Sequence, residues 1–199
     1  MVKTDKETLE RHGDMGTVKN RSGTLRMIAF LWYHPVDPVP EEKTMSITFI
    51  EADRSNIDTL VNFMALYYAY DHIPFDREAA RSAMEQLMND HSLGRAWVIR
   101  SGGEAVGYCV LTLGYSLEYR GRTAFIDELF IKEGYRGKGI GTRALEFLKD
   151  IARALGVTAL RLEVERKNAS AHGLYRKAGF EDQDRHLMTN RITEERHLA

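Results

Sequence analysis

The sequence predicts a single α+β domain, and three observations support this class. In the first half of the chain, short alternating apolar segments are placed to pair as hairpins, whereas strands and helices alternate in the second half. The chain has 199 residues, which is enough for one well-buried domain with an appendage. Its composition, 43% hydrophobic and 29% charged, is that of a globular protein and not of a disordered chain or a membrane span.

A proline cluster separates the start of the chain from this domain. Pro35, Pro38 and Pro40 are three of the 4 prolines, and a charged run follows them, which indicates a linker. We therefore expect residues 45–199 to form the domain and residues 1–44 to be an N-terminal extension. A second methionine opens the domain, so residues 1–44 are open to two interpretations: a loose, disordered extension or a start-site artefact.

Apolar periodicity predicts the elements of the domain in order, with Ser55 and Asp76 as helix N-caps because their side-chain oxygens accept backbone N–H groups. The expected elements are a strand at Ile47–Ile50, helices beginning at Ser55 and Asp76, a hairpin of Trp97–Ile99 with Gly107–Leu113, a strand at Thr123–Ile131, a helix from Ile140 to Leu155 ended by Gly156, a strand at Leu160–Val164, a helix from Asn168 or Ala169 to Ala178, and a last strand from Gly179 to about Met188.

Charge and cysteine content exclude several classes of function. The formal net charge of -1 gives no general attraction to nucleic acid or to anionic membranes. Cys109 is the single cysteine, so no intramolecular disulfide or thiolate metal site can form, and a reducing, cytoplasmic location fits best. The 7 histidines show no metal-ligand spacing, so we expect no metal. The apolar run Met27–Tyr33 is too short to span a bilayer, and we expect no membrane partner.

The glycine-rich turn from Arg136 to Gly141 is the feature with the clearest chemistry. A strand, a glycine-rich turn and a helix form the arrangement in which unpaired N–H groups at a helix start point at an anion, and Arg143 adds positive charge nearby. The alternative interpretation is a tight connection with solvated basic side chains. A dinucleotide fingerprint requires glycine where Thr142 stands, and no Walker-type Lys-Ser or Lys-Thr follows, so both nucleotide motifs are disfavoured.

Four segments taken together resemble the GNAT acetyltransferases over roughly residues 46–189. They are Ile126–Ile131, the turn Tyr135–Gly141, Asn168, and Leu174–Phe180. The turn matches the family pattern Arg/Gln-x-x-Gly-x-Gly/Ala at Arg136, Gly139 and Gly141. The resemblance implies the GNAT fold, which is a mixed, mostly antiparallel sheet of six or seven strands flanked by about four helices.

The resemblance also implies a cosubstrate, acetyl-CoA, and a reaction, direct transfer of the acetyl group to a primary amine in a ternary complex. Similar proteins commonly form homodimers. The alternative is a non-catalytic acyl-CoA-binding sensor. By resemblance, the residues that would contact the cosubstrate are the strand residues Leu129, Phe130 and Ile131 for the pantetheine arm, the turn residues Arg136, Gly137, Lys138, Gly139, Ile140, Gly141 and Thr142 for the pyrophosphate, and Asn168 near the splayed strands.

Tyr175 is the candidate general acid. The resemblance places it close to the thioester sulfur, and a phenol keeps its proton at neutral pH and can donate it to a leaving thiolate. The alternative interpretation is a helix tyrosine that packs its ring beside Leu174 on the sheet.

Asp127 and Glu128 are the candidate bases. Adjacent strand residues point to opposite faces, so simple alternation places Asp127 with Leu129 and Glu128 with Ile126 and Phe130. Family members often have an acceptor-side carboxylate at the parity of Asp127, so we rank it first. The alternative for each is a structural carboxylate paired with backbone or arginine groups.

Two stretches that combine aromatic and acidic side chains are candidates for the acceptor site, since both groups bind cationic amines. They contribute Tyr68, Asp71 and His72 from a helix end, and Tyr115 and Glu118 from a hairpin. The alternative is that these are ordinary core and loop residues. The acceptor itself, a small molecule or a protein amine, is not identified by the sequence.

Overall fold

The computed structural model describes residues 17–19, 25–27, 46–190 and 192. Contacts divide the chain into two units between Thr44 and Met45. In the first unit, β1 (Thr17–Lys19) and β2 (Leu25–Met27) pair as an antiparallel ladder. The proline cluster and Met45 lie outside the described residues, so the interpretation of residues 1–44 stays a prediction.

The second unit is built on one five-stranded sheet with the order β3-β4-β5-β6-β7. Its strands are β3 (Ile47–Glu51), β4 (Gly94–Ser101), β5 (Glu104–Ser116), β6 (Gly121–Ile131) and β7 (Ala159–Leu162). Neighbouring strands from β3 to β6 are antiparallel, and β7 is parallel to β6. The predicted mixed, mostly antiparallel sheet is confirmed, but it has five strands and not six or seven.

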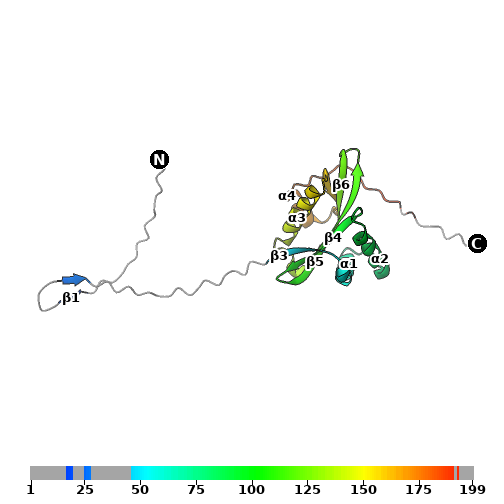
Figure 1. Cartoon of the computed structure of the whole chain (residues 1–199). Coiled ribbons are helices and arrows are strands. Elements are labelled where there is room, and N and C mark those ends of the chain that lie inside the picture. The colour runs from blue at the N-terminus through cyan, green and yellow to red at the C-terminus, as the bar shows by residue number, and fades with distance from the viewer. Residues whose placement is uncertain (1–16, 20–24, 28–45, 191, 193–199) are drawn as a thin grey trace, which may run out of the picture. The chain divides into compact units, whose positions relative to one another are not determined.

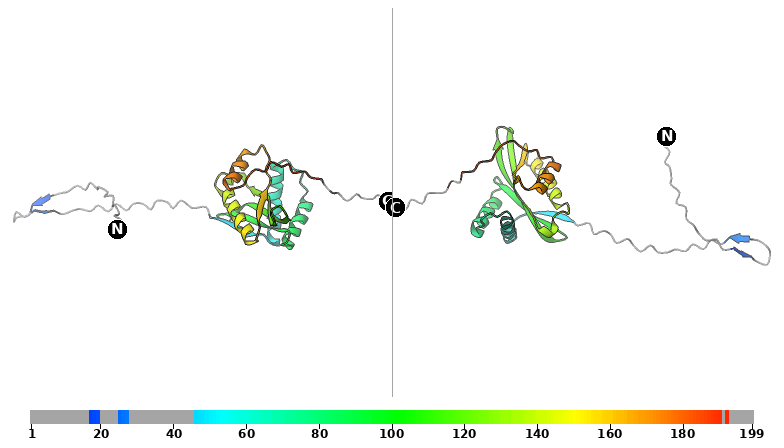
Figure 2. Two further views of the ribbon diagram at one scale, coloured as in Figure 1. Left: turned by 90° about the horizontal axis from the view of Figure 1, so that it is seen from above. Right: turned by 180° about the vertical axis from the view of Figure 1, so that it is seen from behind.

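The last predicted strand, from Gly179 to Met188, is absent, because residues 179–188 adopt no regular structure. Ion pairs hold this segment in place of a ladder. Asp182 pairs with Arg176, and Arg185 pairs with Glu118 at the tip of the long β5–β6 hairpin, which lies beside the segment in Figure 2. These ion pairs link the segment to α4 and to the hairpin, although its backbone adds no strand to the sheet.

Four α-helices cover the two faces of the sheet. They are α1 (Ile57–Tyr70), α2 (Arg77–Asn89), α3 (Ile140–Ala154) and α4 (Ala169–Lys177). Helices α1 and α2 lie on one face and α3 and α4 on the other, as Figure 1 shows. One core cluster lies under α1 and α2 and includes Leu60 and Tyr108, and the other lies under α3 and includes Trp97 and Leu148.

The helix ends follow local side-chain chemistry. The Asp76 carboxylate accepts the N–H groups of Glu78 and Ala79 at 3.0 and 3.1 Å, which confirms it as the N-cap of α2. The prediction of Ser55 as an N-cap is wrong. The Asp53 carboxylate accepts the N–H of Ser55 at 2.8 Å and caps a 3₁₀ turn before α1. A charged carboxylate two residues earlier accepts the free N–H groups in place of the serine hydroxyl.

A β-bulge at Asp127 changes which side chains share a face of β6. Val110 pairs with Glu128 and Leu111 pairs with Ile126, which leaves Asp127 without an opposite residue. Glu128 therefore lies on the α1 side beside Tyr108, whereas Ile126 belongs to the cluster under α3. The expected grouping of Glu128 with Ile126 is wrong, because the extra residue inverts the alternation at this point.

Candidate active site

A cleft opens where β6 and β7 separate. Their parallel pairing ends at Ile126 and Leu162, but β6 continues to Ile131. The side of β6 that faced β7 is therefore left without a strand partner at Leu129, Phe130 and Ile131, and these residues line a cavity of about 1400 Å³. The end of α1, the start of α3 and helix α4 also contribute to its walls.

The glycine turn forms one end of this cavity. Gly137 and Gly139 have φ angles of 74° and 77°, a left-handed backbone that strongly favours glycine. Gly139 is the N-cap of α3 and provides no side-chain cap, so the N–H groups of the first turn are free of side-chain partners. Gly137 and residues 139–142 line the cavity, which places helix-start N–H groups at its surface.

Gly141 has a different reason to be glycine. A Cβ there would lie 3.0 Å from Leu174 Cδ2, so the first turn of α3 packs directly against α4. Gly141, the last glycine of the family pattern, thus has a packing role that the sequence did not indicate.

The Arg136 side chain lines the cavity and extends toward α1. Its Nε donates a hydrogen bond of 2.8 Å to the carbonyl of Ile131. Its guanidinium carbon lies 4.4 Å from the ring centroid of Tyr70 and 5.7 Å from that of Phe130. The charge of Arg136 therefore rests against the aromatic end of α1.

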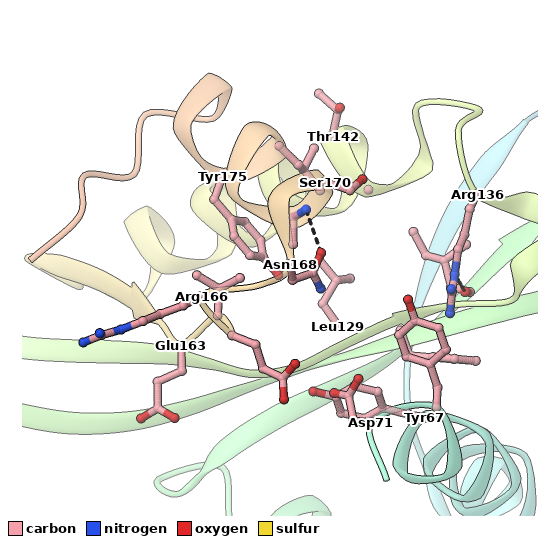
Figure 3. A pocket seen from close by; sticks show the side chains of 18 of the residues that line it. Tyr67, Asp71, Leu129, Arg136, Thr142, Glu163, Arg166, Asn168, Ser170 and Tyr175 are labelled. Atoms are coloured by element: carbon pink, nitrogen blue, oxygen red, sulfur yellow. Dashed lines mark hydrogen bonds between the residues drawn. The ribbon is translucent and has the colours of Figure 1, made fainter. Parts of the chain in front are cut away.

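Tyr175 lies on α4 and Asn168 lies at the start of that helix, and both line the cavity (Figure 3). Asn168 Oδ1 accepts the N–H of Ala171 at 3.1 Å and caps the helix, and its amide N–H₂ group can still donate to a ligand. Tyr175 is half-buried and packs edge-to-face on Phe180 with ring centroids 6.0 Å apart. Burial, and then the charge of Asp71, raises the pKa of Tyr175, so the phenol keeps its proton.

Tyr67 and Asp71 line the opposite wall, at the carboxyl end of α1. The Asp71 N–H donates to the carbonyl of Tyr67 at 3.0 Å. Burial raises the pKa of Tyr67, and so does the charge of the neighbouring Asp71 carboxylate. A helix C-terminus, a carboxylate and aromatic faces together favour a cation. The predicted acceptor stretch began at Tyr67 but named Tyr68 from this helix end, although the i, i+4 spacing of Tyr67 from Asp71 indicates that these two side chains share a helix face.

The two candidate bases lie at the edge of this arrangement, and neither lines the cavity. Glu128 is 8% exposed and accepts a hydrogen bond of 2.7 Å from the Tyr108 hydroxyl. Burial raises the pKa of its carboxyl, while Tyr108 and Tyr68 oppose that shift. Asp127 is exposed at the bulge, and partial desolvation raises the pKa of its carboxyl.

The other acceptor candidates are placed outside the cavity lining. Tyr68 packs in the α1 cluster, and His72 is exposed with a φ angle of 56°. Tyr115 is 74% exposed on the distant hairpin. Glu118 contacts the site indirectly, because it accepts hydrogen bonds of 2.9 and 3.0 Å from Arg185, a cavity residue.

Within the described residues, no group of three or more potential ligands could hold a metal ion. No helix in this part of the chain is long and apolar enough to cross a membrane.

Known proteins resemble this chain in sequence and in fold. Residues 60–180 match the model of the acetyltransferase (GNAT) family. Thialysine N-epsilon-acetyltransferase of Bos taurus is 31% identical over 140 residues, which cover 66% of this chain and 81% of that protein.

Solved structures share the fold. An integron cassette protein from the mobile metagenome of Cole Harbour salt marsh is 36% identical with a TM-score of 0.66, covering 73% of this chain and 90% of that one. An aminoglycoside N-acetyltransferase solved in complex with CoA has a TM-score of 0.66 at 10% identity, covering 76% of this chain and 99% of that one.

Proposed function

Since the chain belongs to the acetyltransferase (GNAT) family and is an acyltransferase, we propose that it transfers the acetyl group of acetyl-CoA to a primary amine of a small molecule. The observation that carries this proposal is one cavity that holds the glycine turn, the free side of β6, Tyr175 and Asp71. An acyl donor and a cationic acceptor can therefore meet there. The bovine relative is named for acetylating an amine, and the aminoglycoside enzyme was solved with CoA, which supports both substrates.

The donor is proposed to lie along the turn and the free side of β6. The N–H groups of residues 137–142 suit the pyrophosphate, because a helix start favours negative charge. The edge of β6 at residues 129–131 has no strand partner on the β7 side, and its backbone groups that Arg136 does not occupy suit the amides of the pantetheine arm. Asn168 can donate from its free amide group, since only its oxygen caps α4. Lys138 and Arg143 lie outside the cavity lining and add longer-range positive charge.

The transfer needs two proton movements. The amine nitrogen attacks the thioester carbon, the C–N bond forms, and the C–S bond breaks to leave the CoA thiolate. Tyr175 is proposed to protonate that thiolate, which contributes roughly 2 kcal/mol at pH 7 if the thiol pKa is about 8.5. The phenol is suited to this role because it lines the cavity and carries its proton at neutral pH.

The acceptor must lose a proton before it attacks. Deprotonating an amine of pKa about 10.4 costs roughly 4–5 kcal/mol at pH 7, so a base is useful. We propose that Asp71 binds the arriving ammonium and that Glu128 accepts the proton. Burial favours Glu128 over the exposed Asp127, and Tyr67, a cavity residue whose pKa is raised by burial and by the charges of Asp71 and Glu128, is close to that carboxyl. Water or the Tyr67 hydroxyl would complete the path.

The test measures thiol release from acetyl-CoA with a panel of amines: thialysine, polyamines, aminoglycosides, amino acid derivatives and a peptide amine. We expect release with at least one small amine and an N-acetylated product by mass spectrometry. Release with none of them, while CoA still binds by calorimetry, would overturn the proposed transfer and favour an acyl-CoA-binding sensor. Release with the peptide alone would overturn the small-molecule assignment.

A further inference from the structure

Two cations from the segment that joins β6 to α3 lie against the aromatic face of α1. Lys132 Nζ is 5.7 Å from the ring centroid of Phe63, and the Arg136 guanidinium carbon is 4.4 Å from that of Tyr70. Phe63, Tyr67 and Tyr70 follow the i, i+4, i+7 spacing of one helix face. The segment that leads into the glycine turn therefore contacts the helix that carries Asp71.

The direction of the Arg136 side chain is fixed by three partners. Nε donates to the carbonyl of Ile131 at 2.8 Å, and the guanidinium lies near both Tyr70 and Phe130. A planar guanidinium stacks on aromatic rings and still donates hydrogen bonds, which a lysine ammonium cannot reproduce. The group is thus held toward α1, at the wall of the cavity that the glycine turn also lines.

The outer side of the last turn of α1 has few other contacts. Tyr70 is 58% exposed, and its neighbours Leu66 and Asp71 are not buried either. The helix ends at Tyr70, and the carboxylate of its C-cap residue, Asp71, faces the cavity opposite Tyr175 (Figure 3). A shift of this turn would move the carboxylate relative to Tyr175.

We propose that Arg136 is a positioning residue for the acceptor: by stacking on Tyr70 it holds the last turn of α1, and with it Asp71, in register with the glycine turn. This inference rests on the proposed function. The pyrophosphate is left to the backbone N–H groups of the turn, so the side chain of Arg136 couples the donor end of the cavity to the acceptor end.

A double-mutant cycle tests the contact kinetically. Arg136→Gln and Tyr70→Leu should each raise the KM for the best amine by about two- to fivefold, the range of an exposed cation–π contact, and Tyr70→Leu, which removes no charge, should leave the Kd for CoA unchanged. The amine KM of the double variant should be no higher than that of the more impaired single variant. Lys138→Gln is the matched control, with weaker CoA binding and an unchanged amine KM. A raised CoA Kd in Arg136→Gln with no effect of Tyr70→Leu would overturn the proposal.

Hydrogen exchange of the free protein provides a readout that does not depend on turnover. In Arg136→Gln and Tyr70→Leu, amides of residues 67–71 should exchange faster than in the unsubstituted chain and in Lys138→Gln. Unchanged exchange in both variants would overturn the proposal whatever the amine panel shows. If the panel shows no transfer but exchange rises as expected, the proposed function fails and the Arg136–Tyr70 contact stands.

Discussion

The Tyr108 hydroxyl donates a hydrogen bond of 2.7 Å to the Glu128 carboxylate beneath α1. The two side chains lie on adjacent strands, β5 and β6, and both are buried. A buried carboxylate is sensitive to the loss of its hydrogen-bond donor, because no water is present to donate a hydrogen bond in its place.

Tyr108→Phe should therefore destabilise the protein and move the pKa of Glu128 further upward. The loss of one partner from a buried hydrogen bond costs about 1–3 kcal/mol, measured by urea unfolding at pH 7. The acidic limb of the pH–rate profile should move to higher pH, since Tyr108 holds the pKa of Glu128 down. Tyr115→Phe, at a site 74% exposed, is the control and should change neither quantity.

Glu128→Gln should stabilise the protein at neutral pH and reduce turnover. The folded-state pKa of Glu128 is raised above its ordinary value of 4.5, so its contribution to stability is full below pH 4.5 and is lost as pH rises through the raised value. The melting temperature of the variant should thus exceed that of the unsubstituted protein at pH 7, and the difference should disappear below about pH 4.

The kinetics of the same variant separate the two candidate bases. Glu128→Gln should remove the acidic limb of the pH–rate profile, and Asp127→Asn should leave it in place. The reverse pattern would assign proton transfer to Asp127.

Tyr175→Phe should lower kcat by about tenfold to 100-fold and leave the Kd for CoA unchanged, because only the developing thiolate needs the phenol proton. Stopped assays of thiol release and calorimetry with CoA measure the two quantities. Phe180→Leu is the matched control for ring packing, since it keeps the hydroxyl and removes the edge-to-face partner. Equal losses of kcat in both variants would mean that Tyr175 acts through packing.

Gly139→Ala should weaken CoA binding and stability together. An alanine at φ 77° is strained by about 1–2 kcal/mol, although its Cβ would meet no atom within 4 Å. Gly134→Ala is the control, because that residue also has open space but no left-handed backbone. Thermal melts and CoA calorimetry should separate the two, and an unchanged Gly139→Ala protein would contradict the need for this backbone conformation.

Glu118→Gln should raise the amine KM without changing the CoA Kd or the melting temperature. Glu118 holds Arg185 from the hairpin tip, and Arg185, His186 and Leu187 line the cavity. Loss of this ion pair removes the contact that positions Arg185 at the cavity. It should change the free energy of unfolding little, since the pair is exposed to solvent. Asp150→Asn, which breaks the exposed ion pair with Arg153 away from the cavity, should leave all three quantities unchanged.

Local chemistry allowed much of the fold to be predicted. The Asp76 cap, the Gly102–Gly103 turn between β4 and β5, the apolar stripe of α3 and its end at Gly156 all depend on residues close in sequence. The glycine turn was also recognisable, because its function requires a particular backbone and not a distant partner. The last strand was predicted wrongly: residues 179–188 adopt no regular structure, and the ion pairs of Asp182 and Arg185 depend on partners in other elements.

By itself, the sequence determined the α+β class, the glycine turn at the start of α3 and the family resemblance. Only the tertiary structure decided which charged groups meet in the cavity. The bulge at Asp127 inverted the faces of β6, the Arg136 guanidinium turned toward Tyr70, and Glu118 contacts the cavity only through Arg185. Each of these depends on strand register or on contacts between residues far apart in the chain, which local periodicity does not encode.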